Sequence, residues 1–223
     1  KRVLVTAADC RLGAPESGLE RDSGDGAAAL VFEDSPEVIA TVEGSYSVSN
    51  ELMDVWRLQG EAFTSMEEDR FTEDEGYLKV VNEAVSGLMR QHGLTSKDFT
   101  KVVFYAPNSR SYRAITGKLG FDFSQIQEPL FDSVGNTGTA SSLMMLVAAL
   151  EEAKSGDRIL LASYGDGSDA FILQATEHIS DKSQGIKAYV QSKKVFDDYR
   201  KYLKWRGILP VDKGRSVLIP RPS

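Results

Sequence analysis

Residues 139–153 form the segment that most constrains how this chain can fold. Its apolar side chains leave no polar face on a helix; they are Ala140, Leu143, Met144, Met145, Leu146, Val147, Ala148 and Leu150. A helix that is apolar nearly all round is stable in water only when other elements enclose it. The sequence therefore predicts a layered fold in which a helix over residues Thr139–Ala153 is buried.

Apolar runs of strand length occur on both sides of this segment in the chain. The predicted strands are Val3–Ala8, Ala27–Phe32, Val38–Val42, Val102–Tyr105, Ile159–Ser163 and Phe171–Ala175. We expect the last four to form one mixed sheet against the buried helix. The last two read as a hairpin across Gly165–Gly167, placed at the edge of the sheet.

Two amphipathic helices are predicted between these strands. Thr72 and Glu75 have the spacing of a capping box, before an apolar face that ends near Gly93. Ser109 is placed to cap a second helix that closes at Gly120, since glycine suits the left-handed turn that ends helices. The order of strands and helices predicts the α/β class.

Composition excludes several classes of protein. Of the 223 residues 41% are hydrophobic and 26% charged, and no apolar run approaches the roughly 18 residues of a membrane span. One cysteine cannot form an internal disulfide, and one cysteine with two histidines disfavours a zinc site. We therefore expect a cytoplasmic protein with no membrane partner, no metal and no permanently bound cofactor.

Charge is distributed unevenly along the chain. Residues 182–223 contain eleven Lys/Arg and three Asp/Glu, a net charge of +8, which leaves −15 for residues 1–181. Such a segment can meet nucleic acid or phosphates, but its aromatic residues from Tyr189 to Tyr202 fall near helical spacing. We interpret residues 181–223 as a basic amphipathic helical tail that docks on protein, and we expect no nucleic-acid partner.

The tetrapeptide Gly135-Asn136-Thr137-Gly138 stands directly before the predicted buried helix. The first N–H groups of a helix are unpaired, and an Asn side chain both donates and accepts, so this position suits the binding of a developing oxyanion. The same residues also suit a tight turn in which Asn136 only caps the helix. Taken alone, the tetrapeptide leaves both interpretations open.

Several longer segments share one further pattern in their order and spacing. They are Glu20–Phe32, Trp56–Gly60, Arg70–Tyr77, Val134–Ser142, Lys154–Asp166 and Ser168–Phe171. The first resembles the closing strand of the first half of the thiolase superfamily, and the others resemble its second half, with order and spacing similar to the 3-hydroxy-3-methylglutaryl-CoA synthase branch, especially the archaeal type. The 3-oxoacyl-acyl-carrier-protein synthase III enzymes share that fold and a similar Gly-Asn-Thr pattern. The resemblance extends from Lys1 to Gly207.

The resemblance implies an αβαβα layered fold of two similar halves and a homodimer. Residues 1–34 would be the last strands of the first half, and residues 35–180 the complete second half. It also implies Claisen-type carbon–carbon bond formation with a coenzyme A thioester as substrate. Lys1 would follow the helix that bears the family's Cys nucleophile, so we expect this chain alone to be inactive until an upstream half completes it.

The resemblance also assigns site residues. Asn136 carries over directly as a catalytic residue. Where the family has Phe-His-x-Pro-Asn, this chain reads Phe104-Tyr105-Ala106-Pro107-Asn108, so Tyr105 stands at the histidine position. A phenol donates a hydrogen bond to an oxygen but does not ordinarily shuttle a proton at neutral pH. The expected cofactor-binding residues are Asn108, Arg110, Gly135 and Gly138. Of these, Arg110 is expected to bind a coenzyme A phosphate.

Two classes of function stay open. The first is a condensing enzyme resembling hydroxymethylglutaryl-CoA synthase or 3-oxoacyl-acyl-carrier-protein synthase III. The second is a non-catalytic thiolase-fold subunit that channels acyl-CoA between partners such as a thiolase or an acyl-CoA-binding protein, and the missing histidine favours it. Cys10 follows a strand and enters a loop, without a helix dipole to activate a thiol, so we predict that it is not the nucleophile.

Overall fold

The computed structural model describes residues 1–181 and 185–209, in two compact units with a boundary between Val190 and Gln191. The strands are β1 (Arg2–Cys10), β2 (Asp25–Glu33), β3 (Ala40–Ser49), β4 (Val55–Trp56), β5 (Ser65–Met66), β6 (Lys101–Phe104), β7 (Arg158–Gly165) and β8 (Gly167–Ala175). The α-helices are α1 (Gly18–Asp22), α2 (Asp69–Phe71), α3 (Leu78–His92), α4 (Ser109–Leu119), α5 (Ser141–Glu152), α6 (Lys187–Gln191) and α7 (Tyr199–Trp205).

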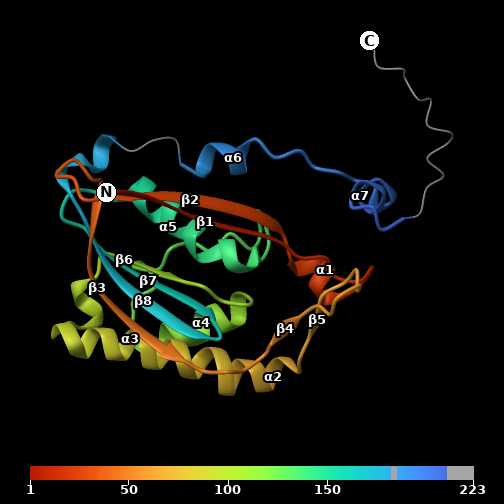
Figure 1. The fold of residues 1–223 in the computed structure, drawn as a ribbon, viewed down its shortest axis with the longest axis horizontal. Helices are drawn as coiled ribbons and strands as arrows, with labels where there is room; N and C mark the ends of the chain where they lie inside the picture. The colour runs from red at the N-terminus through yellow and green to blue at the C-terminus, as the bar shows by residue number, and fades with distance from the viewer. Residues whose placement is uncertain (182–184, 210–223) are drawn as a thin grey trace, which may run out of the picture. The chain divides into compact units, whose positions relative to one another are not determined.

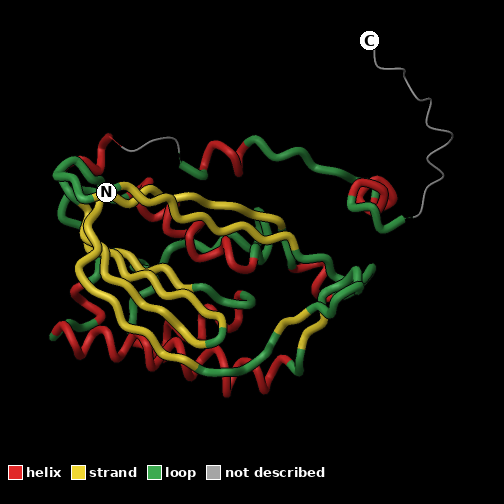
Figure 2. Tube along the Cα trace, viewed as in Figure 1, coloured by secondary structure: helices red, strands yellow, loops and turns green. Residues whose placement is uncertain are grey.

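Helix α5 lies between two sheets, as the all-round apolar segment predicts (Figure 1). Strands β1 and β2 pair on one side of it, and a four-stranded sheet lies on the other (Figure 2). Met145, Leu146 and Leu150 of α5 share one core with residues of that sheet, and Leu30 of β2 packs against this core. The expected buried helix is confirmed, although its first turn, Gly138–Ala140, is a 3-10 helix.

The four expected strands form one mixed sheet in the order β3-β8-β7-β6. Strand β6 runs parallel to β7, whereas β7–β8 and β3–β8 are antiparallel. The hairpin across Gly165–Gly167 exists, but its expected position at the edge is wrong, because β7 and β8 occupy the centre. Their side chains are buried on both faces, which suits central strands, whereas β3 alternates exposed and half-buried residues as an edge strand does.

The two faces of this sheet belong to two different cores. Val102 and Phe104 face the core that α3 and α4 cover, while Val103, between them, faces the core of α5. This alternation is the period-two geometry of a strand buried on both sides. The resulting layers are the β1–β2 pair, α5, the mixed sheet, and α3 with α4 (Figure 1).

The starts of α3 and α4 differ from expectation. The capping box at Thr72 is wrong, because the chain is already helical from Asp69 and continues through a π-helical turn over Thr72–Tyr77. The Thr72 hydroxyl instead donates to the Glu68 carbonyl at 3.3 Å. Helix α4 is capped by Asn108, whose Oδ1 accepts from Ser111 N at 2.9 Å, so Ser109 is its first residue and not its cap.

Both predicted helix ends are confirmed. Gly93 and Gly120 have φ angles of 64° and 69°, the left-handed conformation that closes a helix.

In the second unit, Asp198 caps α7, and the Phe196 and Trp205 rings lie 4.7 Å apart. Part of the predicted tail, residues 182–184 and 210–223, lies outside the described residues. No helix in the described ranges is both long and apolar enough to cross a membrane.

Candidate functional site

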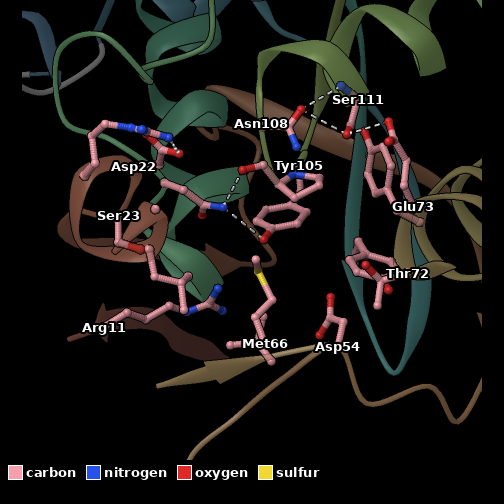
Figure 3. Close-up of a pocket in the computed structure, with 18 residues that line it drawn as sticks. Arg11, Asp22, Ser23, Asp54, Met66, Thr72, Glu73, Tyr105, Asn108 and Ser111 are labelled. Carbon is pink, nitrogen blue, oxygen red and sulfur yellow. Dashed lines mark hydrogen bonds and ion pairs between the residues drawn. The ribbon is translucent and has the colours of Figure 1, made fainter. Parts of the chain in front are cut away.

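Asn136 and Tyr105 meet at one cavity. Tyr105 directly follows β6, and Asn136 lies in the loop before α5; Asn136 Nδ2 donates to the Tyr105 hydroxyl at 3.3 Å (Figure 3). Both residues line a cavity of about 190 Å³. The expected convergence of these two side chains, 31 positions apart in sequence, is therefore confirmed.

The Asn136 amide is held in one orientation. Its Oδ1 accepts from Gly138 N at 2.9 Å, and its Nδ2 also donates to the Pro107 carbonyl at 3.0 Å. Its backbone N–H donates to the Asp22 carbonyl at 2.8 Å, which ties the loop to the end of α1. Helix α1 lies between the predicted strands Val3–Ala8 and Ala27–Phe32, where the sequence analysis predicted no helix, so this support was not identified from the sequence.

Gly135 and Gly138 are required by close packing and by backbone conformation. Their φ angles are 87° and 53°. A Cβ on Gly135 would lie 2.9 Å from the Ser23 carbonyl carbon, and one on Gly138 would lie 2.0 Å from an Asp9 carboxylate oxygen. Gly138 also lines a second, more open cavity of about 520 Å³ beside the first. Binding of coenzyme A beside these two glycines stays a proposal.

Three tyrosine rings pack together at the cavity. Tyr105 stacks on Tyr164 at 6.0 Å between ring centroids, and Tyr77 meets both rings edge to face at 6.5 and 5.5 Å. Burial, with smaller contributions from neighbouring tyrosines and Glu73, raises the pKa of Tyr77, and its hydroxyl has no hydrogen-bond partner among the described residues. Burial likewise raises the pKa of Tyr164. Both phenols are therefore neutral at physiological pH.

Arg110, which was expected to bind a coenzyme A phosphate, already has a partner within the protein. Arg110 forms an ion pair with Glu73, whose side chain is only 11% exposed, while the Arg110 side chain is 71% exposed. Ser111 Oγ donates to the other Glu73 oxygen at 2.8 Å and lies 3.1 Å from Asn108 Oδ1. Glu73, Asn108 and Ser111 line the cavity (Figure 3). Arg110 is not part of the lining and contacts the cavity only through Glu73. The sequence analysis did not single out Glu73 as a site residue.

Arg11 is a site residue that the sequence analysis missed. Its side chain is 22% exposed and pairs with Asp9 at 3.0 Å. It lines both cavities together with Tyr105, Asp54 and Tyr164. Cys10, one position earlier, is exposed at the end of β1 and lines neither cavity. No cluster of His, Cys, Asp and Glu in the described ranges has the arrangement of a metal site.

Comparisons with known proteins agree on one group of enzymes. Residues 89–176 match the family model of the 3-oxoacyl-[acyl-carrier-protein] synthase III C terminal. Hydroxymethylglutaryl-CoA synthase of Methanopyrus kandleri is 36% identical over 91% of this chain and 59% of its own length. The enzyme of that name from Aeropyrum pernix is 35% identical over 94% of the chain and 59% of its length. The chain thus spans less than two thirds of these relatives.

Solved structures show the same fold. A crystal structure of HMG-CoA synthase complexed with CoA superposes with a TM-score of 0.70, at 17% identity, over 85% of this chain and 53% of that one. The 3-oxoacyl-[acyl-carrier-protein] synthase III of Aquifex aeolicus gives a TM-score of 0.63 at 21% identity, over 78% of this chain and 58% of that one. At these identities the likeness concerns the fold alone.

Proposed function

Because this chain belongs to the hydroxymethylglutaryl-CoA synthase family and has the thiolase fold, we propose that it forms part of an acyl-CoA condensing enzyme. In this proposal the chain supplies the oxyanion-binding half of an active site. A further segment that supplies the Cys nucleophile and the general base is part of this proposal. A homodimer, a cytoplasmic setting and an acyl-CoA-channelling partner protein are further parts of the proposal, as is the division into residues 1–34, 35–180 and 181–223.

The observation that supports this function best is the hydrogen bond between Asn136 and Tyr105 at the cavity. Carbon–carbon bond formation on thioesters develops negative charge on a carbonyl oxygen. Neutral donors fixed in advance stabilise such charge without reorganisation. The Asn136 amide is fixed by Gly138 and Pro107, and the Tyr105 ring by two neighbouring tyrosines. Both Nδ2 hydrogens of Asn136 are used, by Tyr105 and by the Pro107 carbonyl, so Asn136 orients the Tyr105 hydroxyl, which is the donor left for the oxyanion.

Binding of coenzyme A is proposed for the cavity rim. Arg110 is exposed there and contacts Glu73, so a phosphate would compete with that carboxylate for the guanidinium. Asn108 lies within the cavity, and Gly135 and Gly138 keep the neighbouring loop close to it. The thioester is substrate in this scheme, and no resident cofactor is required.

The main test is Asn136→Ala in the full-length protein. Loss of the amide that orients the Tyr105 donor is expected to lower turnover of acetyl-CoA in condensation about 100-fold or more, while folding is retained. Condensation is measured by release of free coenzyme A, and folding by the urea midpoint. Asp132→Ala, an exposed change in the preceding loop, is the matched control and should keep full activity. Full turnover by Asn136→Ala would demote Asn136 to a helix cap.

The alternative function is a non-catalytic subunit that binds acyl-CoA for a partner. The observation in its favour is Tyr105, which replaces the family's histidine and does not ordinarily exchange a proton at neutral pH. Acyl-CoA binding without condensation by the full-length wild type would support this alternative. Condensation that Tyr105→Phe reduces would instead support the enzyme.

A further inference from the structure

Arg11 lies beside Tyr105, and the proposed chemistry has assigned it no function. Its side chain is largely buried, and it lines the same two cavities as Tyr105. It comes from the end of β1, far in sequence from Tyr105 at the end of β6. A charged side chain in this place requires specific partners, because burying a cation without them is costly.

The position of Arg11 is built by β1 and by the loop before α5. Arg11 Nε donates to Asp9 Oδ2 at 3.0 Å, and the same oxygen accepts from Thr139 N at 3.1 Å. A Cβ on Gly138 would lie 2.6 Å from Arg11 Nε, so this glycine leaves the space in which the ion pair lies. The Asp9 carboxylate that holds the guanidinium is therefore itself fixed by Thr139 before any ligand binds.

The neighbours of Tyr105 determine how its hydroxyl can act. Asn136 presents Nδ2 to the Tyr105 oxygen, because Gly138 and Pro107 fix the orientation of the amide. Arg11 interacts with the same hydroxyl, and a guanidinium has donors only. Both neighbours direct hydrogens at the oxygen, so the single hydrogen of Tyr105 is left for another acceptor.

We propose that Arg11 is a positioning residue that fixes Tyr105 as a hydrogen-bond donor toward a carbonyl oxygen in these cavities. The identity of that carbonyl as an acyl thioester rests on the proposed function. Burial alone would lower the pKa of Arg11, but Tyr105 and Asp9 outweigh it and raise the pKa above its ordinary value. The donor direction therefore holds at every physiological pH, and a charge behind the phenol strengthens its hydrogen bond.

The binding test uses two ligands that differ in one oxygen. Isothermal titration calorimetry on the full chain compares acetyl-CoA with S-ethyl-CoA, a thioether that lacks the carbonyl oxygen. The wild type should prefer acetyl-CoA about 10-fold, the usual effect of one such hydrogen bond. Arg11→Gln should lose most of the preference, and Arg11→Lys, which keeps a charged donor, should retain part of it. Arg2→Gln, an exposed change on the same strand, should leave it unchanged.

A second measurement needs no ligand. With 3-fluorotyrosine at position 105, the ¹⁹F resonance reports the surroundings of the hydroxyl directly. Arg11→Gln should displace this resonance, while Arg2→Gln should not; circular dichroism confirms that each variant is folded. If the wild type shows no preference for acetyl-CoA but Arg11→Gln moves the resonance, the proposed thioester chemistry fails and the pairing stands. An unmoved resonance, or a preference that Arg11→Gln retains, overturns the inference.

Discussion

The residues at the cavity differ in how well the sequence alone identifies them as site residues. Asn136 is a candidate because it lies in a glycine-bounded turn directly before a strongly apolar helix, and the family resemblance gives it a catalytic role. Tyr77 reads only as one apolar position on a helix face, and Arg11 only as a charge after a strand. Both reach the cavity through contacts between segments distant in sequence, and single-sequence periodicity does not carry such contacts.

Gly76 is the residue whose substitution should disturb the tyrosine cluster most directly. A Cβ there would lie 2.6 Å from the Tyr164 hydroxyl and 2.9 Å from a Leu52 methyl group. Gly76→Ala should therefore lower the free energy of unfolding by about 1–3 kcal/mol, as overpacking usually does. Urea unfolding measures the loss, and the near-ultraviolet circular dichroism of the tyrosines should change with it.

The matched control is Gly117→Ala in α4, where no atom lies within 4 Å of the added methyl group. Because alanine is the better helix former, this change should raise stability by up to about 1 kcal/mol. Equal effects of the two substitutions would show that helix propensity, and not the space beside Tyr164, determines the result at Gly76.

At the scale of elements, α5 holds the two sheets together. Met145 and Leu146 are each 1% exposed, and the same core contains residues of β6, β7 and β8. Ser141 and Ser142 in its first turn are buried as well, so the helix is enclosed on several sides. A loss of packing at α5 would therefore destabilise both sheets.

Leu146→Ala should therefore be strongly destabilising. Removing a buried leucine side chain leaves a cavity between close-packed layers, and the expected loss is about 2–5 kcal/mol in the free energy of unfolding. Urea denaturation followed by far-ultraviolet circular dichroism gives the value. Lys118→Ala, an exposed change on α4, should stay within about 0.5 kcal/mol. A loss below about 1 kcal/mol at Leu146 would contradict the enclosed position of α5.

At the scale of the whole molecule, the two compact units contribute unequally to the core. Every buried residue of both cores falls between Tyr77 and Ile179, within the unit Lys1–Val190. In the second unit, Val195 and Trp205 are 85% and 72% exposed. The larger unit therefore contains the packing that makes unfolding cooperative.

Truncation after Val190 should leave the free energy of unfolding within about 0.5 kcal/mol of the full chain, because none of the described residues that it removes belongs to either core. Urea unfolding of both forms at low and at high salt gives the comparison. A salt-dependent loss on truncation would instead support the docking of the basic tail on the acidic body that the charge pattern suggests, since such attraction is screened by salt.

The sequence by itself determined the α/β class, the enclosed helix, four strands of the mixed sheet and the place of Asn136. These features depend on local periodicity and on glycines at helix ends, which neighbouring residues encode. Only the tertiary structure decided that β7 and β8 are central, that α3 starts through a π-helical turn, and that Arg11 meets Tyr105. Strand order and cavity lining depend on which distant surfaces fit together, and packing, not local preference, selects that fit.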